Sequence, residues 1–537
     1  MKTIFLIGMP GSGKTSFGKR AAKELNMTFL DTDAIIEERD GMTIAELFAQ
    51  KGEPYFRARE SAMIAEIAAA AMCEKGMREA SDFGAAANDA DTAPGSKIQI
   101  AAAAGRIVSV GGGAIEREEN VRAMRRGGIV VFIDRSLADI ESGVRYGADR
   151  PLLSDSAGLA ALYARRSRLY PAAAHRVLKN EGEYERVLER LLAMICLLGV
   201  TADYCVIGDP IAHSLSPLLH GAAFKFLGAD AVYGAARVPR GQLRDALADV
   251  RAGRLKGMNV TVPHKFGAAE YADETQGDAV RSGAVNTLLH REGRLIGYNT
   301  DMEGLLLALN REGQGYAGRN VAILGSGGAA AGVAHKAAAE GASRIVLVGR
   351  NVRMLREISA ACARGSAPGR GRGGAASGSR VRIDAARYDF ETPVAAGAER
   401  ARGPVQLSAG ADVPDSAPGA GNCAAWGDIL SDTDILINAT PLGMEGAAAR
   451  FSDFDFLKAL PKRALVYDLI YRPAETALLT AAKTLGLNAV NGLGMLIYQG
   501  ILSDELFLDR SIDGADRETL FEVIRGRLMM KGGLDRI

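Results

Sequence analysis

The sequence has almost no net charge and few cysteines. Its 65 basic and 64 acidic side chains leave a net charge of +1, so no strong electrostatic field attracts nucleic acid or an anionic membrane surface. The five cysteines form no Cys-x-x-Cys pair, which argues against both a disulfide framework and a zinc site. We therefore expect a protein of the reducing cytoplasm that acts on small molecules, with no nucleic-acid or membrane partner.

Long hydrophobic runs are also missing. The longest uncharged apolar run, LLAMICLLGV at 191–200, is shorter than the roughly 20 residues that a membrane span needs, and it predicts a buried helix end. The opening MKTIFLIGMPGSGK has no small-residue cleavage site, so no export signal is expected. A chain of 537 residues is too long for one hydrophobic core, and several domains are expected.

Short apolar runs alternate with helical spacing over a first module, residues 1–195. The run at 3–8 predicts a strand, KTSFGKRAAKEL predicts a helix, and TFLDTD at 28–33 predicts a second strand. This β-loop-α-β order predicts an α/β fold with a parallel sheet. Further strands are expected at 106–110, 128–134 and 175–179.

Two later segments open further modules. ADYCVIGDPIAHSLSP begins at 202, and NVAILGSGGAAAG at 320–332 has the pattern of a strand, a glycine loop and an Ala-rich helix. We expect an α/β substrate-binding domain over 201–302, completed by about 490–537, and a Rossmann-type domain over 303–489, with one cleft between them. The stretches 84–105 and 363–422 have a composition that buries little apolar surface, so we interpret them as flexible insertions.

The stretch GMPGSGKT at 8–15 is a complete phosphate-binding loop after a predicted strand. Its glycines let backbone N–H groups surround a phosphate, Lys14 adds a positive charge, and Thr15 offers a hydroxyl to Mg²⁺. Asp31 is placed to support Mg²⁺ through water, and Asp33 to hold and deprotonate an acceptor hydroxyl. Taken alone, two aspartates after a strand are more often a helix cap or a turn. The predicted nucleotide ligands are Gly11, Ser12, Gly13, Lys14, Thr15 and Ser16.

Four further blocks follow this loop: YFRARE (55–60), SVGGGA (109–114), DRPLL (149–153) and RRSRLY (165–170). Together with the loop they resemble shikimate kinase over about residues 1–195. The resemblance implies ATP and Mg²⁺ as cofactors, with Arg150 closing on the ATP phosphates and Glu60 orienting Arg57. Guanidinium groups suit this work because they match carboxylates and phosphates bidentately. The shikimate ligands that the resemblance implies are Asp33, Arg57, Gly111, Gly112, Gly113 and Arg166.

A second glycine loop has the G-x-G-x-x-A form of the dinucleotide fingerprint, with Gly325, Gly327 and Ala330. It lies between a predicted strand and a helix whose N-terminus can face a pyrophosphate. Arg350 ends the next predicted strand, where an NAD-specific protein has an acidic residue, and an arginine there can meet a 2′-phosphate. The expected cofactor is therefore NADP(H). Its predicted ligands in this segment are Gly325, Ser326, Gly327, Gly328, Ala329, Arg350, Asn351 and Arg353.

Seven blocks in order resemble shikimate dehydrogenase over residues 202 to about 500: HSLSP, NVTVPHK, GAVNTL, GYNTD, NATPLGM, YDLIYRP and GLGMLIYQ. Ketone reduction needs a proton donor beside the carbonyl oxygen, and Lys265 and Asp301 fit the acid/base roles. The resemblance implies that Thr440 and Met495 lie toward the nicotinamide. It also implies these ligands of the substrate carboxylate and hydroxyls: Ser214, Ser216, Thr261, Asn286 and Gln499.

The two glycine loops thus predict two successive reactions of aromatic amino-acid (chorismate) biosynthesis on one chain. NADPH would reduce 3-dehydroshikimate to shikimate, and ATP would phosphorylate shikimate to shikimate 3-phosphate. The alternatives are a dehydrogenase that prefers quinate, or one half acting as a non-catalytic ligand-sensing module. RNA binding through GRGRGG is disfavoured by the near-zero net charge. Oligomeric state stays open. The expected catalytic residues are Lys14, Asp33, Lys265 and Asp301. The presence of all four disfavours a non-catalytic half.

Overall fold

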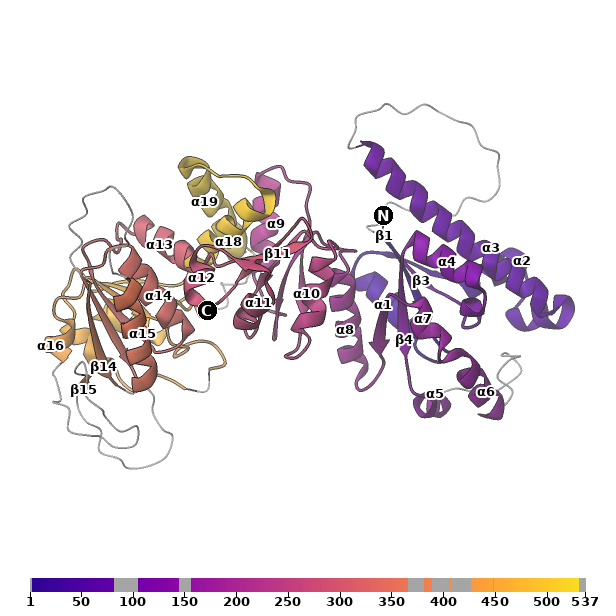
Figure 1. Cartoon of the computed structure of the whole chain (residues 1–537), viewed down its shortest axis with the longest axis horizontal. Coiled ribbons are helices and arrows are strands. Elements are labelled where there is room, and N and C mark those ends of the chain that lie inside the picture. Colours follow the sequence, from indigo (N-terminus) through magenta and orange to yellow (C-terminus); the bar gives the residue numbers. More distant parts are fainter. Residues whose placement is uncertain are drawn as a thin grey trace. The chain divides into compact units, whose positions relative to one another are not determined.

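The computed structural model of the chain describes residues 2–81, 105–143, 156–365, 381–388, 405–407, 426–447 and 449–530. Arg150 and most of the two stretches interpreted as insertions lie outside the described residues. Contacts divide the chain into two compact units (Figure 1), unit 1 over Met1–Asp203 and unit 2 over Tyr204–Ile537. Among the described helices, none combines the length and the hydropathy of a bilayer-crossing segment.

Unit 1 is built on a five-stranded sheet of order β2-β3-β1-β4-β5, in which all neighbouring strands are parallel. Apolar runs form these strands because both faces of a parallel sheet are covered; Ile4 and Leu6 of β1 are fully buried. The five strands expected in this module are confirmed. Their bounds are β1 (Lys2–Ile7), β2 (Thr28–Asp31), β3 (Gly105–Ser109), β4 (Ile129–Asp134) and β5 (Arg176–Lys179).

The strand expected through DTD is shorter than predicted. It ends at Asp31, and Asp33 lies in the first turn of helix α2 (Thr32–Asp40). The Asp31 carboxylate accepts a hydrogen bond from the Asp33 N–H at 3.2 Å and caps this helix, a position that aspartate favours. Gly105 was expected in an insertion, but it begins β3 and pairs with Lys2.

Helices cover both faces of this sheet, because alternate side chains of a strand point to opposite faces. Side chains of β1 pack with α1 and α8 on one face and with α3 and α4 on the other. Leu191, in the apolar run at 191–200, is fully buried within α8, which confirms the predicted buried helix end. The helices are α1 (Lys14–Glu24), α3 (Ile44–Ser81), η1 (Ala114–Glu116), α4 (Glu118–Gly127), α5 (Leu137–Gly143), α6 (Ser156–Arg166), α7 (Leu169–Ala173) and α8 (Tyr184–Leu197).

The first sheet of unit 2 has six strands in the order β7-β6-β8-β10-β11-β9. It is mixed: β6 is parallel to β7 and β8, whereas β10 is antiparallel to β8 and β11. The strands are β6 (Tyr204–Gly208), β7 (Tyr233–Arg237), β8 (Gly257–Val260), β9 (Glu274–Thr275), β10 (Thr287–Arg291) and β11 (Arg294–Tyr298). The helices between them are α9 (Ser216–Phe226), α10 (Leu243–Arg251), α11 (Lys265–Tyr271) and α12 (Asp278–Ser282).

The second sheet of unit 2 has the order β15-β14-β13-β12-β16-β17-β18. From β14 to β18 this is the doubly wound order of dinucleotide-binding sheets, so the predicted Rossmann-type fold is confirmed. The strands are β12 (Asn320–Leu324), β13 (Arg344–Gly349), β14 (Arg382–Arg387), β15 (Val405–Leu407), β16 (Ile435–Asn438), β17 (Leu465–Asp468) and β18 (Asn488–Val490). The helices are α14 (Gly328–Ala339), α15 (Val352–Gly365), α16 (Trp426–Leu430), η2 (Asp455–Ala459) and α17 (Ala477–Thr484).

Two of these strands contradict the interpretation of 363–422 as a flexible insertion. β14 pairs in parallel with β13, and β15 pairs antiparallel with β14. Ala385 and Ala386 of β14 are buried in the two cores on opposite faces of the sheet. The segment extends the sheet because its backbone forms hydrogen bonds with β13. The composition of the segment does not reveal these distant partners.

The chain returns to the first sheet of unit 2 through α18 (Leu493–Leu508), which packs against α9 and α13 (Asp301–Arg311). Figure 1 shows α18 and α19 (Gly514–Met530), in yellow, beside α9. At the far end of α18, the Tyr204 hydroxyl of β6 donates to Phe507 O at 2.7 Å. Helix α18 therefore joins the two sheets of this unit.

Candidate active sites

The loop between β1 and α1 has the backbone form of a phosphate-binding loop. Gly8, Gly11 and Gly13 have φ values of 154°, 80° and 97°, which residues with a Cβ rarely adopt. The buried Lys14 amine donates to the carbonyl oxygens of Gly8 and Met9 at 2.9 and 3.1 Å. The lysine and the N-terminus of α1 thus face the same loop, an arrangement that stabilises a phosphate group.

Two residues that the sequence interpretation missed support this loop. Arg135 Nη1 donates to Gly11 O at 3.0 Å, and Asn180 Nδ2 donates to Ser12 O at 2.9 Å. Each residue directly follows a strand, β4 or β5, on the edge where ligands collect in parallel sheets. That position was the signal available in the sequence. Ser16, in the first turn of α1, donates to the Tyr184 hydroxyl at 3.4 Å.

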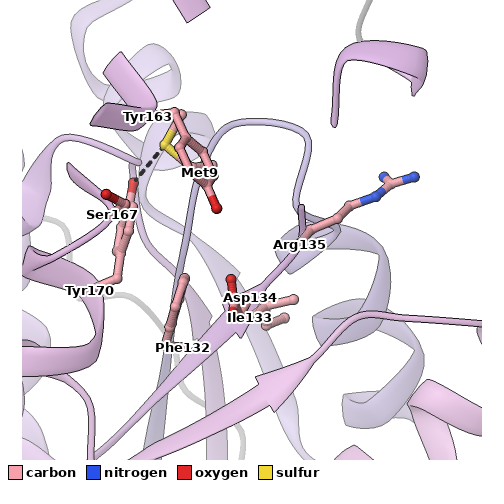
Figure 2. Close-up of a pocket in the computed structure, with 8 residues that line it drawn as sticks. All are labelled: Met9, Phe132, Ile133, Asp134, Arg135, Tyr163, Ser167 and Tyr170. Carbon is pink, nitrogen blue, oxygen red and sulfur yellow. Dashed lines mark hydrogen bonds between the residues drawn. The ribbon is translucent and has the colours of Figure 1, made fainter. Parts of the chain in front are cut away.

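A cavity of about 20 Å³ lies beside the phosphate-binding loop (Figure 2). Figure 2 shows the Tyr170 hydroxyl pointing toward Met9 Sδ, 3.8 Å away. A space of this size holds about one water molecule, so it is too small for a nucleotide or a sugar-like acid. Its lining residues are Met9, Phe132, Ile133, Asp134, Arg135, Tyr163, Ser167 and Tyr170.

Oxygen donors that suit Mg²⁺ meet at the start of α1. Thr15 Oγ1 donates to Asp31 Oδ2 at 2.9 Å and lies 3.2 Å from Ser109 Oγ. In phosphotransferases Mg²⁺ is held by one or two protein oxygens together with phosphate oxygens and waters. The chemistry of these donors fits the predicted Mg²⁺ site.

Gly111 and Gly113 approach side chains from two other elements. A Cβ on Gly111 would lie 2.3 Å from Glu60 Oε1 and 2.9 Å from Asp33 Oδ1. A Cβ on Gly113 would lie 2.4 Å from both terminal nitrogens of Arg57. With these side chains in place, only glycine fits at the two positions. The structure therefore brings the predicted ligands from α2, α3 and the loop after β3 close together.

Arg57 is held by two carboxylates of its own helix. Its Nη1 donates to Glu60 Oε2 at 2.8 Å and its Nε to Glu53 Oε1 at 3.2 Å. Burial raises the pKa of Glu60 to about 7, although Arg57 opposes the shift. Burial and then the negative charge of Asp31 raise the pKa of Asp33 to about 6. Two neighbouring acids with raised pKa values are typical of catalytic sites.

Arg166 ends helix α6 and is buried, and its Nε donates to Glu116 Oε1 at 2.9 Å. The positive charges of Arg57 and Arg166 both oppose the raised pKa of Glu60, so the two arginines lie near the same carboxyl. The Tyr170 hydroxyl donates to Gly112 O at 2.7 Å and holds the glycine turn. The sequence interpretation assigned no role to Glu116 or Tyr170, because their partners lie 50 and 58 residues away.

In unit 2, Lys265 Nζ lies 2.6 Å from Asp301 Oδ2, and these side chains are 28% and 16% exposed. Asn286 Nδ2 donates to Asp301 Oδ1 at 2.9 Å and to Gln499 Oε1 at 3.3 Å. Four predicted residues from α11, α13, α18 and the segment before β10 are thus brought together. A lysine–aspartate pair that stays accessible can exchange a proton with a bound ligand.

The three remaining predicted substrate ligands follow strands β6 and β8. Thr261 comes directly after β8, and its Cγ2 lies 2.5 Å from where a Cβ on Gly208 would be. The Ser216 N–H donates to Ser214 Oγ at 3.3 Å. Ser216 also begins α9, with Pro217 in the first turn, as expected for a helix start. The roles of these three residues as substrate ligands stay predictions.

A buried polar network behind Asn286 was not predicted. Asn259 Nδ2 donates to Thr287 Oγ1 at 3.0 Å and to Ser503 Oγ at 3.1 Å, and Thr287 Oγ1 donates to Asn286 Oδ1 at 2.9 Å. The Thr300 N–H donates to the same amide oxygen at 2.9 Å. Three of these residues lie in the quoted sequence blocks, which were the available signal, whereas Ser503 is found only from the fold.

The loop after β12 lies against the segment that follows β16. A Cβ on Gly325, whose φ is 127°, would lie 3.4 Å from Thr440 Cγ2. Gly327 has open space around it and precedes α14, whose N-terminus suits a pyrophosphate. The ring of Phe266, the residue after the paired lysine, lies 3.1 Å from where a Cβ on Gly328 would be. This loop therefore fits the predicted dinucleotide site and borders the Lys265 segment. Ser326 lies in the loop before α14, and Gly328 and Ala329 are the first two residues of that helix.

The predicted cofactor residues after β13 differ in their surroundings. Arg350 is exposed directly after the strand, where the ribose of a dinucleotide is recognised. Asn351 Oδ1 accepts a hydrogen bond from the Met354 N–H at 3.1 Å, so its side chain caps α15. Arg353 Nε pairs with Glu357 of the same helix at 2.9 Å. The position of Arg350 directly after the strand is the one that matches ribose recognition.

The turn at Thr440 is held by a buried amide–carboxylate pair. Thr440 Oγ1 donates to Asn438 Oδ1 at 2.7 Å, and Asn438 Nδ2 donates to Asp468 Oδ1 at 2.9 Å. Neither Asn438 nor Asp468 was assigned a role from the sequence, although both lie in the quoted blocks. Met495 lies in the first turn of α18, where its N–H donates to the Tyr467 hydroxyl at 3.3 Å.

The fold and the two sites define a two-unit α/β enzyme, with a phosphate-loop phosphotransferase followed by a dinucleotide-dependent oxidoreductase. A model of the shikimate kinase family matches residues 10–73 and 98–196, and a model of the shikimate dehydrogenase substrate binding domain matches residues 206–288. The chain belongs to the shikimate dehydrogenase family and carries a shikimate kinase unit before that part, so it is a bifunctional enzyme of the shikimate pathway.

Individual relatives match the dehydrogenase part of the chain. The shikimate dehydrogenase (NADP(+)) of Symbiobacterium thermophilum is 38% identical over 305 residues, which cover 57% of this chain and 88% of the relative. That of Streptococcus gordonii is 34% identical over 315 residues, covering 58% and 93%. A crystal structure of shikimate 5-dehydrogenase from Thermus thermophilus in complex with NADP(H) and shikimate is 28% identical, with 60% and 99% coverage and a TM-score of 0.45.

Proposed function

We propose that unit 2 reduces 3-dehydroshikimate to shikimate with NADPH, and that unit 1 phosphorylates shikimate with ATP and Mg²⁺. The observation that carries the proposal is the accessible Lys265–Asp301 pair, which Asn286 holds beside the dinucleotide loop. A proton donor next to a nicotinamide site is what carbonyl reduction requires. We assign residues 1–195 to the kinase domain, 201–302 with about 490–537 to substrate binding, and 303–489 to NADP binding.

A nicotinamide held by unit 2 would supply the hydride, and the protein's own residues manage the proton. Lys265 donates a proton toward the substrate oxygen, where its charge also stabilises developing negative charge. Asp301 accepts a hydrogen bond from a neighbouring substrate hydroxyl and keeps the lysine amine in place. The remaining contacts to hydroxyls and to the carboxylate come from Asn286, Gln499, Thr261, Ser214 and Ser216, while Arg350 meets the 2′-phosphate, with Thr440 and Met495 toward the nicotinamide.

In unit 1, Asp33 holds the acceptor hydroxyl and takes its proton, and Arg57 and Arg166 grip the shikimate carboxylate. The loop N–H groups and Lys14 stabilise charge on the transferring phosphoryl group. Mg²⁺, when bound with the nucleotide, neutralises phosphate charge, and Thr15 and Asp31 would hold it. Arg150, outside the described residues, is the expected lid arginine.

The test uses the purified chain with ATP, Mg²⁺ and 3-dehydroshikimate, and follows ADP before and after NADPH is added. The proposal expects ADP only after NADPH, with matching NADPH loss. NADPH loss without ADP would mean that the kinase unit is silent or needs another acceptor. If no NADPH is lost, oxidation of quinate with NADP⁺ is tested next. If that reaction is also absent, unit 2 would be a ligand-binding module.

A further inference from the structure

A histidine and an aspartate pair with each other inside unit 2, away from the Lys265–Asp301 site. His220 Nδ1 lies 2.7 Å from Asp504 Oδ1, and the two side chains are 1% and 0% exposed. His220 belongs to α9 and Asp504 to α18, so the pair joins two helices that are far apart in the sequence. The roles proposed for unit 2 do not use this pair.

Both helices carry predicted substrate ligands one turn or slightly more before the pair. Ser216 begins α9 four residues before His220, and Gln499 lies in α18 five residues before Asp504. Residues four apart, such as Ser216 and His220, lie on one face of a helix, and Gln499 is carried by the same helix as Asp504. Any shift of α9 against α18 at the pair therefore moves Ser216 relative to Gln499.

The pair also borders the polar network that holds Asn286. The His220 ring stacks on the Tyr233 ring, with centroids 4.1 Å apart, and the Tyr233 hydroxyl donates to Asn259 Oδ1 at 2.5 Å. Ser503, next to Asp504 on α18, donates to Gln499 O at 2.9 Å. Asn259 Nδ2 thus donates hydrogen bonds both to the backbone oxygen of Asn286 and to Ser503 of α18.

A buried histidine–aspartate pair is not an efficient source of stability. Replacing such a pair by apolar residues of similar volume often leaves the stability of a protein unchanged or raises it. His220 Nε2 and Asp504 Oδ2 have no hydrogen-bond partner within the described part of the chain, and the rings around the pair include Phe224 and Phe507. What the pair adds over an apolar contact is direction, because a hydrogen bond fixes one register between two helices.

We propose that His220 and Asp504 are positioning residues of the dehydrogenase site. Their hydrogen bond fixes α9 against α18. Ser216 and Gln499, which are predicted to bind the carboxylate and hydroxyls of the substrate, then face one substrate molecule. This inference rests on the function proposed for unit 2. It predicts an effect on the affinity for the hydroxylated acid substrate and not on the affinity for the dinucleotide.

The test compares Michaelis constants in the full chain. The double variant His220→Leu/Asp504→Leu replaces the pair by apolar side chains, which should preserve folding. We expect its KM for 3-dehydroshikimate to rise by about tenfold, because a small misplacement of binding residues weakens substrate binding. The KM for NADPH should change by less than about twofold. Asp504→Asn keeps an oxygen that can accept from His220 Nδ1–H and should restore a KM close to that of the wild type.

A matched control separates positioning from stability. Phe507→Leu removes volume from the aromatic side chains beside the pair but keeps both partners of the His220–Asp504 hydrogen bond, and should lower the unfolding temperature but leave the KM for 3-dehydroshikimate unchanged. Phosphorylation of added shikimate by unit 1 normalises the amount of chain in each sample, and the KM for NADPH reports an intact dinucleotide site in unit 2. If the double variant does not fold, Asp504→Ser replaces it, because the shorter side chain cannot reach His220.

Three results would overturn the inference: an unchanged substrate KM in the double variant, an equal rise in Phe507→Leu, or a rise in Asp504→Asn as large as that of the double variant. Failure of the function proposed for unit 2 looks different, because the wild-type chain itself would not oxidise NADPH with 3-dehydroshikimate. In that case the same variants would be compared with quinate and NADP⁺.

Discussion

Lys265 Nζ lies 2.6 Å from Asp301 Oδ2, although 36 residues separate the two in the sequence. Asn286 holds the other carboxylate oxygen at 2.9 Å, so the aspartate orients the lysine while both remain accessible. An amine fixed in this way can supply a proton without first losing the entropy of an unordered side chain. The predictions below begin from this pair.

Lys265→Ala should abolish reduction and leave phosphorylation intact. Removing a general acid lowers kcat by about 10²- to 10⁴-fold, and unit 1 folds around its own core. NADPH oxidation with 3-dehydroshikimate and ADP formation with added shikimate are measured on the same sample. Lys225→Ala, an exposed lysine of α9, serves as the control and should affect neither activity. Loss of both activities in folded Lys265→Ala protein would contradict independent sites.

Lys14→Ala should give the opposite pattern. Without the lysine, charge on the transferring phosphoryl group is less stabilised, and kcat for phosphorylation should fall by about 100-fold or more. Reduction of 3-dehydroshikimate should keep its wild-type rate, which NADPH absorbance checks. A chain that phosphorylates normally without this amine would show that the loop does not hold the reacting phosphates.

Gly111→Ala should inactivate the kinase unit. A Cβ there would lie 2.3 Å from Glu60 Oε1 and 2.9 Å from Asp33 Oδ1, so at least one carboxylate must move from the pocket. We expect kcat/KM for shikimate to fall by about 100-fold or more, measured by coupled ADP release. Gly526→Ala in α19, where a Cβ meets nothing within 4 Å, is the matched control. Wild-type phosphorylation by Gly111→Ala would remove this turn from the site.

Arg350→Ala should weaken NADPH binding and reduce the preference for NADPH over NADH. A lost charge-assisted hydrogen bond to the 2′-phosphate corresponds to a rise of about 10- to 100-fold in the KM for NADPH. The KM for NADH should change little, since NADH lacks that phosphate. Arg353→Ala should have a smaller effect, because Arg353 already pairs with Glu357. The assignment fails if both cofactors are affected equally.

The stability of unit 1 should fall as the pH rises through the range set by Glu60. Burial raises the pKa of this carboxyl from 4.5 to about 7, so the folded state retains a proton that the unfolded chain releases. The resulting stabilisation is fully present below the unfolded pKa of 4.5 and is lost as the pH passes about 7. The complete change is about 3 kcal/mol in the free energy of unfolding.

Glu60→Gln tests this dependence, because the amide stays neutral and still offers an acceptor to Arg57. Unfolding temperatures of both chains are compared at about pH 5.5 and about pH 8.5, on either side of the folded pKa. The wild-type chain should lose more stability than the variant between the two conditions. Parallel curves would mean that Glu60 does not titrate as its burial predicts.

Much of this protein was determined by the sequence alone. Local rules predict both glycine loops, the strands before them and the helices after them. A glycine that allows positive φ and an apolar run that forms a strand can each be recognised without knowing any distant partner. The order of the motif blocks placed Lys265, Asp301 and Asn286 in one unit, and Arg350 marked the end of the strand after the second glycine loop. These expectations agree with the fold and with the relatives of the chain.

Other features were decided only by the tertiary structure. β14 pairs with β13 although it lies within a stretch whose composition resembled an insertion, and Glu116 is the partner of Arg166. The His220–Asp504 pair likewise forms across 284 residues. In each case the deciding partner is distant in the sequence, and a side chain or a strand edge acquires its role only when folding brings that partner within hydrogen-bonding distance.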